Sequence, residues 1–242
     1  MKTVLITGAS RGIGAAIAKK LNNSYNLVLT YYKNKEKAIN LLNELRLSNP
    51  NVIAVKCDVK NEEDVNNLFD LAEKNFSHVD ILINNAGISY FGLLQDMDFS
   101  SRNCLLDTNL SSIFLTSKRA IPKMISEKSG VIINISSIWG NLGASFEVAY
   151  SASKGGVNSF TKALSKELLP SNVRVNVISP GIVETDMTKF DLSEEDKKSL
   201  KEDLIEKRFA KSEEIANLVE FLISDKGSYI TGSIFDINGG FY

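Results

Sequence analysis

The 242-residue sequence has few of the residues that mark disulfide-rich or metal-binding proteins. It contains two cysteines, Cys57 and Cys104, and a single histidine, His78. Two cysteines form no disulfide framework, and their spacing to each other and to the histidine is not that of metal ligands. We therefore predict no metal site, and we interpret the cysteines as core or helix-packing residues and the histidine as structural or solvated rather than catalytic.

Long apolar runs are also missing. No run reaches the roughly 18–20 apolar residues that a membrane-spanning helix needs. The first ten residues, MKTVLITGAS, lack the apolar region and the cleavage site of a signal peptide. The formal net charge is −1, which gives no electrostatic reason to expect nucleic acid or an acidic membrane as a partner. These absences favour a soluble cytoplasmic protein with no nucleic-acid and no membrane partner.

Short apolar, β-branched runs alternate with longer amphipathic stretches along the chain. Most of the runs are apolar on both faces, as parallel strands covered on both sides are. The expected strands cover residues 3–7, 26–31, 52–57, 79–84, 130–136, 173–179 and 233–237. The expected helices cover residues 12–22, 35–47, 61–75, 109–127, 149–169 and 212–224. The alternation predicts the α/β class, with a doubly wound parallel sheet and helices on both faces.

Linkers, repeats and low-complexity tracts are missing as well, so we expect one domain over residues 1–242. One charged stretch, 184–211, separates the sixth expected strand from the next helix. It is either a pair of solvated surface helices or a lid, because insertions after the carboxyl ends of strands border the ligand crevice. Its position favours a substrate lid.

A glycine-rich turn, TGASRGIG, follows the first expected strand and carries Gly8, Gly12 and Gly14. Glycines here let the backbone approach a pyrophosphate, whose charge the N-terminus of the next helix stabilises. Such a turn can also be purely structural. Its place in the first strand–helix unit favours nucleotide binding.

The end of the second expected strand bears on the choice of nucleotide. Dinucleotide sites usually carry an acid there for the adenosine ribose, whereas this chain has Tyr31, Tyr32 and Lys33 and no acid before Glu36. An acid would repel a 2′-phosphate, and Arg11 in the glycine turn would attract one. We therefore predict NADP(H) rather than NAD(H); the alternative for Arg11 is a solvated residue at a helix start.

The stretch YSASK places Tyr150 and Lys154 four residues apart. In a helix, side chains at this spacing meet on one face. A cation beside a phenol favours the phenolate and lowers a pKa that is ordinarily near ~10. The pair predicts a tyrosine that exchanges a proton near neutral pH, although the same spacing taken alone is more often a surface pair.

The glycine turn, YSASK and five further motifs, in this order along the chain, resemble those of the short-chain dehydrogenase/reductase family. The further motifs are Asp58-Val59, NNAG at 84–87, Asn109 in NL, Ser137 in NISS, and SPGIVET at 179–185. The resemblance covers essentially the whole chain and implies a single Rossmann-like domain, usually assembled as a homotetramer or homodimer. It implies that NADP(H) contacts Gly8, Ser10, Arg11, Gly12, Ile13, Gly14, Tyr31, Asp58, Val59, Asn85, Ala86, Gly87, Tyr150, Lys154, Pro180, Gly181, Val183 and Thr185.

The resemblance also implies the catalytic roles. Tyr150 would be the general acid in ketone reduction, and Lys154 would lower its pKa and hold the nicotinamide ribose. Ser137 would hydrogen-bond the carbonyl oxygen, where negative charge develops. Asn109 would help to hold a proton-relay water behind the lysine.

Two branches of the family share features with this chain. Its length, glycine turn and GSIFDINGG tail resemble 3-oxoacyl-acyl-carrier-protein reductases, although Ser171 stands where those enzymes usually have a basic residue. Trp139 beside the catalytic serine and Glu147 before Tyr150 resemble the reductases of the 5-aminopentanone group on elongation factor P. The resemblance therefore implies an NADPH-dependent ketoreductase whose ketone is free or is carried on either protein.

Both substrate-side residues have simpler explanations. A carboxylate at the mouth of a pocket suits a substrate ammonium, but Glu147 can equally be a solvated or arginine-paired acid. Trp139 is a pocket wall or a packing residue. The same fold also serves proteins that bind NADP(H) only as a sensor. The presence of all four catalytic residues argues against that alternative.

Overall fold

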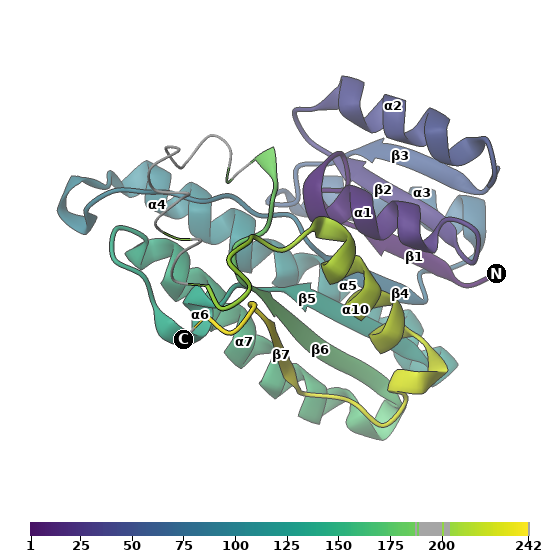
Figure 1. The fold of residues 1–242 in the computed structure, drawn as a ribbon. Coiled ribbons are helices and arrows are strands. Elements are labelled where there is room, and N and C mark those ends of the chain that lie inside the picture. Colours follow the sequence, from purple (N-terminus) through teal and green to yellow (C-terminus); the bar gives the residue numbers. More distant parts are fainter. Residues whose placement is uncertain (187, 189–199, 201–203, 242) are drawn as a thin grey trace.

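Seven parallel strands form one sheet in the computed structural model of the protein, which describes residues 1–186, 188, 200 and 204–241 (Figure 1). The strands are β1 Thr3–Ile6, β2 Asn26–Tyr31, β3 Val52–Lys56, β4 Ile81–Asn84, β5 Gly130–Ile135, β6 Val173–Pro180 and β7 Ile234–Ile237. Their order is β3-β2-β1-β4-β5-β6-β7, so the chain crosses between β1 and β4. In open α/β sheets ligands bind at such a switch point, outside the carboxyl ends of the strands.

Helices cover both faces of this sheet (Figure 1). They are α1 Gly12–Leu21, α2 Lys35–Arg46, α3 Glu62–Phe76, α4 Phe99–Leu106, α5 Ser112–Glu127, α6 Trp139–Leu142, α7 Val148–Leu168 and α10 Ser212–Ile223. Successive strand residues point to opposite faces, which divides the core in two. One part joins the sheet to α1, α2 and α10, and the other joins it to α3, α5 and α7. The predicted doubly wound parallel sheet is confirmed.

Helix α4 was not predicted. It begins after Asp98, whose carboxylate accepts a hydrogen bond from the backbone N–H of Ser101 and also bonds the hydroxyls of Ser100 and Ser101. These contacts hold the pKa of Asp98 well below its usual range. The helix has little apolar periodicity, so its N-cap was the only local signal that could have revealed it. By contrast, Asn61 caps α3 as its sequence predicts.

The stretch 109–127, which the sequence predicts as one helix, is in fact two kinds of helix. Residues Asp107–Ser111 form a π-helical turn, and α5 begins only at Ser112. A π turn inserts one extra residue and changes which way its side chains point. Asn109 lies in this turn and is fully buried.

Four buried polar side chains cross-link the sheet to α5 and α7 beside the switch point. Asn84 on β4 donates to Asn134 on β5 at 2.9 Å, and Asn134 donates to Thr161 at 2.8 Å. Thr116 donates to Asn84 at 2.7 Å. Such a satisfied network fixes register and orientation in a core that is otherwise apolar.

Most of the predicted lid, 184–211, lies outside the described residues. Its two ends are described, and they pair with each other. The N–H of Glu184 donates to the carbonyl of Ala210 at 2.8 Å, and the N–H of Ala210 donates to Ile182 at 2.9 Å. This pairing anchors both ends of the segment next to the carboxyl end of β6.

Candidate active site

The glycine turn after β1 packs tightly against the segment after β4. Gly8 has a φ of +65°, and a Cβ there would lie 2.9 Å from the Cα of Ala86. A Cβ on Gly14 would lie 2.6 Å from the side-chain nitrogen of Asn85 and 2.7 Å from the carbonyl oxygen of Gly8. That side chain donates to the carbonyls of Thr7 and Gly8. Only glycine permits this approach, which leaves a backbone-lined cradle at the start of α1.

A cleft of about 480 Å³ runs along the carboxyl ends of the strands from this cradle. It is lined by the glycine turn, the end of β2, the segments after β3, β4, β5 and β6, and the first turns of α7. These residues fit a dinucleotide, because the cradle can hold a pyrophosphate and the cleft continues from it toward β2 and β3 on one side and toward α7 on the other.

One end of the cleft lies beside β2 and β3 and carries Tyr32, Asp58 and Lys60. Lys60 donates to Asp58 through both its ammonium, at 2.9 Å, and its backbone N–H, at 3.1 Å. Burial alone would raise the pKa of Asp58, but these hydrogen bonds, the Lys60 charge and the Tyr32 hydroxyl outweigh it and lower that pKa. The carboxylate therefore stays ionised and fixed in orientation.

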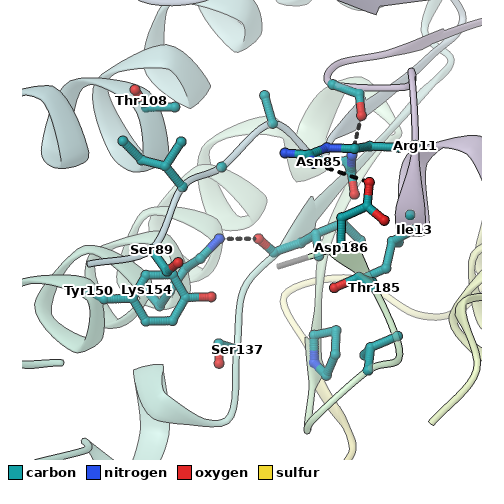
Figure 2. A pocket seen from close by; sticks show the side chains of 18 of the residues that line it. Arg11, Ile13, Asn85, Ser89, Thr108, Ser137, Tyr150, Lys154, Thr185 and Asp186 are labelled. Atoms are coloured by element: carbon teal, nitrogen blue, oxygen red, sulfur yellow. Dashed lines mark hydrogen bonds and ion pairs between the residues drawn. The ribbon is translucent and has the colours of Figure 1, made fainter. Parts of the chain in front are cut away.

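Three charged side chains meet beside the glycine turn. Asp186, after β6, pairs with Arg11 at 3.2 Å and with Lys37 at 2.6 Å, through the same carboxylate oxygen. Figure 2 shows Arg11 and Asp186 facing each other at the side of the cleft away from Tyr150. Hydrogen bonds from Lys37 and Arg11 lower the pKa of Asp186.

The opposite end of the cleft carries Tyr150 and Lys154, side by side on the first turns of α7 (Figure 2). The Lys154 ammonium lies 5.7 Å from the centre of the Tyr150 ring and donates to the carbonyl of Ile135 at 2.9 Å. Lys154 is only 4% exposed, and burial lowers its pKa to about 8. The predicted meeting of the two side chains on one helix face is therefore present.

The predicted direction of the Tyr150 pKa is wrong for this structure. Burial raises the pKa of Tyr150 to about 12; a hydrogen bond with Ser137 opposes this rise and the charge of Glu147 adds to it. The surface of Tyr150 is partly exposed, but enough protein surrounds the phenol for desolvation to dominate. Since the same burial disfavours the Lys154 cation, the lysine does not offset it. Tyr150 is accordingly protonated at neutral pH.

Asn109 lies behind this pair and holds the segment after β4 in place. Its side-chain oxygen accepts from the N–H of Ile88 at 2.9 Å, and its nitrogen donates to the carbonyl of Ile88 at 2.9 Å and to Ser153 at 3.1 Å. A Cβ on Gly87 would lie 3.3 Å from that oxygen and 3.6 Å from the Lys154 ammonium. The asparagine oxygen and the ammonium thus border the same glycine.

Aromatic side chains gather at the substrate side of the cleft. Phe91 and Trp139 line it together with Glu147. Phe91 stacks on Phe146 with ring centres 5.2 Å apart, and Trp139 contacts Phe241 edge-on at 5.5 Å. Trp139 is therefore both a wall of the cleft and a packing residue.

Comparison with known proteins places the chain in a family. The family profile described as short chain dehydrogenase matches residues 2–196. The chain belongs to the short-chain dehydrogenase family. It is an oxidoreductase of the classical type, as the sequence predicts.

Individual relatives cover the whole chain. It is 38% identical over 242 residues to the 3-oxoacyl-[acyl-carrier-protein] reductase FabG of Staphylococcus epidermidis, covering 100% of this chain and 99% of that protein. It is also 38% identical to the uncharacterized oxidoreductase YmfI of Bacillus subtilis, covering 100% and 99%. A solved structure from Agrobacterium tumefaciens, provisionally assigned as a gluconate dehydrogenase, superposes with a TM-score of 0.94 at 29% identity, covering 99% and 95%.

The cleft of this short-chain dehydrogenase brings together most of the residues that the sequence predicts. Of the predicted cofactor, catalytic and substrate residues, all line the cleft except Gly14 and Asn109. Gly14 packs against Asn85, and Asn109 supports the wall from behind. These positions do not test the roles themselves, which stay predictions.

Sequence reasoning missed several lining residues. Cys57 and Cys104, both interpreted as packing residues, line the cleft; Cys57 is buried as expected, whereas Cys104 is exposed. Lys60, Asp186 and Phe91 line it too. They come from segments that meet only in the folded chain, and apart from the position of Lys60 near Asp58 no local pattern marks them.

Within the described residues, no group of three or more histidine, cysteine or acidic side chains has the arrangement of a metal site. The same part of the chain contains no helix that is long and apolar enough to span a membrane.

Proposed function

We propose that this short-chain dehydrogenase uses NADPH to reduce a ketone to a secondary alcohol, with a 3-oxoacyl group on acyl carrier protein as its substrate. The observation that carries the proposal is the meeting of Tyr150, Ser137 and Lys154 in the cleft that the glycine turn also lines. The 38% identity to FabG reductases over the full chain supports this substrate.

In this proposal a bound nicotinamide supplies the hydride, and the chain supplies a proton and the geometry. Tyr150 donates its phenolic proton to the carbonyl oxygen as the alcohol forms. Its raised pKa keeps that proton in place at neutral pH. Ser137, 8% exposed and hydrogen-bonded with Tyr150, holds the same oxygen where negative charge develops.

Lys154 and Asn109 act around this proton donor. The Lys154 ammonium, held by the Ile135 carbonyl, is placed to bind the nicotinamide ribose and to stabilise the phenolate that proton transfer leaves. Asn109 fixes Ile88 and Ser153, and so the wall beside the lysine. A proton-relay water held there stays a proposal.

The preference for NADPH rests on the cations near the end of β2. Arg11 and Lys33 line the cleft beside Tyr31 and Tyr32, and Asp58, which follows the next strand, is already engaged by Lys60. Since no acid follows Tyr31 directly, a 2′-phosphate meets attraction rather than repulsion there. A charge-assisted phosphate contact is worth roughly 1.5–3 kcal/mol, about tenfold or more in Kd.

The test is turnover of a 3-oxoacyl thioester, free and on acyl carrier protein, followed by loss of NADPH absorbance. We expect turnover of both, with a higher kcat/KM for the protein-bound substrate and for NADPH over NADH. No turnover of any ketone, together with tight NADPH binding, would identify a non-catalytic sensor and overturn the proposal. Equal dissociation constants for NADPH and NADH would overturn the cofactor preference alone.

A second candidate substrate is an amino ketone, such as the 5-aminopentanone group on elongation factor P. Glu147 favours it, because this carboxylate lines the cleft and acts electrostatically on Tyr150. The aromatic walls Phe91 and Trp139 also suit a cation. An ammonium between a carboxylate and aromatic faces is better held than a neutral acyl chain.

Glu147→Gln separates the two substrates, because it removes the charge and keeps the shape. If the substrate carries an ammonium, the variant should raise KM for an amino ketone several-fold and leave a neutral 3-oxoacyl thioester unchanged or improved. An equal effect on both ketones would show damage to the start of α7, and no effect on either would remove Glu147 from recognition.

We also propose that the chain assembles into a homotetramer or homodimer. Phe99 at the start of α4 and Phe114 on α5 are exposed apolar side chains, 71% and 54% accessible, which favours a partner surface. Light scattering at micromolar concentration checks this, and a monomer under those conditions would contradict it.

A further inference from the structure

The meeting of Arg11, Lys37 and Asp186 has the form of an occupied anion site. Both cations donate to one oxygen of Asp186, and they come from two different elements, the glycine turn and the first turn of α2. A single oxygen that collects two cationic donors is the arrangement that phosphate oxygens favour. Here an internal carboxylate fills the position.

This anion site borders the part of the cleft beside β2. Arg11 and Asp186 line the cleft together with Tyr32, Lys33 and Asn34, and Lys37 lies three residues after Asn34, in the first turn of α2. The side chains of Arg11 and Lys37 are about half exposed, and that of Asp186 is 26% exposed, so none of the three charges is buried. Their pairing can therefore be exchanged at little cost, unlike a buried pair.

Asp186 is attached to a short, internally bonded turn. The hydroxyl of Thr188 accepts from the N–H of Thr185 at 3.0 Å and donates to the carbonyl of Val183 at 2.9 Å. A Cβ on Gly12 would lie 3.4 Å from a methyl carbon of Thr185, so this turn leans directly on the glycine turn. An anion that replaces Asp186 between the two cations therefore also changes the contacts of the turn after β6.

We propose that Asp186 is a cofactor-discriminating residue: it occupies the Arg11–Lys37 anion site and is exchanged for the 2′-phosphate of the cofactor. The inference rests on the proposed use of NADPH. A phosphate dianion carries more charge than the carboxylate and binds both cations in its place. NADH has no such group, so it leaves the Asp186 pairing intact. Asp186 thus lowers the affinity for NADPH and leaves that for NADH unchanged.

The test measures dissociation constants by calorimetry, which needs no turnover. Asp186→Asn removes the competing charge and should tighten NADPH binding about 3- to 10-fold, the range that losing one or two solvated ion pairs provides. NADH binding should change less than about twofold. The fragments 2′,5′-ADP and 5′-AMP should repeat this contrast, because only the first carries the 2′-phosphate.

Lys37→Met tests the same site from the other side. It should weaken NADPH and 2′,5′-ADP about 5- to 10-fold and leave NADH and 5′-AMP within about twofold. Lys37 lies on the surface of α2, so this variant is suited to a case in which Asp186→Asn folds poorly. Glu44→Gln is the matched control for Asp186→Asn. It also removes an acid from a solvated ion pair, the one with Lys19, and Glu44 does not line the cleft.

Three outcomes would overturn the inference: Asp186→Asn weakens both cofactors equally, Asp186→Asn leaves NADPH binding unchanged, or Glu44→Gln produces the same gain. The first outcome would mean that Asp186 stabilises the glycine turn and does not discriminate between the cofactors. Equal binding of NADPH and NADH by the wild type would refute the proposed cofactor preference separately. In that case, tighter binding of NADPH alone by Asp186→Asn would still support Asp186 as the occupant of the Arg11–Lys37 anion site.

Discussion

The two ends of the cleft hold their cations in opposite ways. At the catalytic end Lys154 is 4% exposed, and its ammonium is held by the backbone carbonyl of Ile135. At the other end the side chain of Lys37 is 54% exposed and is paired with Asp186, which Arg11 shares. Lys154 is thus a fixed, desolvated cation, whereas Lys37 is a solvated cation whose partner can be exchanged.

The chemistry follows this difference. Burial shifts the pKa of Lys154 and of Tyr150 because water no longer stabilises their charged forms. At the solvated end, water and a counter-charge both stabilise the ions, and exchange is easy. One end is therefore suited to moving a proton at a fixed place, and the other to recognising a charged group.

The largest effect should come from the proton donor at the buried end. Tyr150→Phe removes the phenolic hydroxyl and keeps the ring. Because general acid catalysis contributes at least ~100-fold, kcat should fall by that factor or more while NADPH binding stays nearly intact. Steady-state kinetics with a ketone and calorimetry with NADPH check this. Wild-type turnover in the variant would refute the assignment.

The buried lysine should appear in the pH dependence of stability. Its pKa is about 8 in the folded chain and 10.5 when unfolded, so between these values the unfolded chain binds more protons. The free energy of unfolding should therefore rise with pH across this window, by at most about 1.4 kcal/mol per unit from this group. Tyr150 acts in the opposite direction above pH 10, because its folded pKa is raised.

Denaturant unfolding of the wild type and Lys154→Met at pH 7.5 to 9.5 isolates the lysine. The difference between the two should change in favour of the wild type as the pH rises. A difference that stays constant would show that Lys154 is not desolvated, and the contrast between the two ends would fail.

An intermediate effect is expected at Asn109. Asn109→Ala leaves the N–H and carbonyl of Ile88 without their side-chain partner, at a cost of about 1–3 kcal/mol of stability. Thermal unfolding measures the loss. If Asn109 acts by holding the wall, kcat should fall and the KM for ketone should rise together. A fall in kcat with stability unchanged would favour a direct role in proton relay.

The smallest effect on stability belongs to the solvated end. Lys37→Met removes one exposed ion pair, and such pairs contribute roughly 0–1 kcal/mol. We expect the free energy of unfolding to change by less than that amount, while NADPH affinity changes several-fold. A large loss of stability would mean that the Asp186 cluster is structural, which would remove the contrast with Lys154.

Much of the fold could be predicted because its signals are local. All seven strands lie within two residues of the bounds expected from the apolar runs, since a buried parallel strand must be apolar on both faces. Helix α4 was missed because it is short and weakly amphipathic, and the π turn around Asn109 was missed because nothing in the spacing distinguishes it from an α-helix.

The sequence by itself determined which groups exist and which share an element: the glycine turn, the Tyr150–Lys154 spacing and the missing acid after Tyr31. The tertiary structure decided their state. Burial around α7 raised the pKa of Tyr150, where the spacing alone indicates that Lys154 lowers it. Folding also brought Asp186 to Arg11, 175 residues away in the chain. Spacing specifies neighbours on one helix or strand, whereas desolvation and long-range charge pairing depend on every element packed around the site.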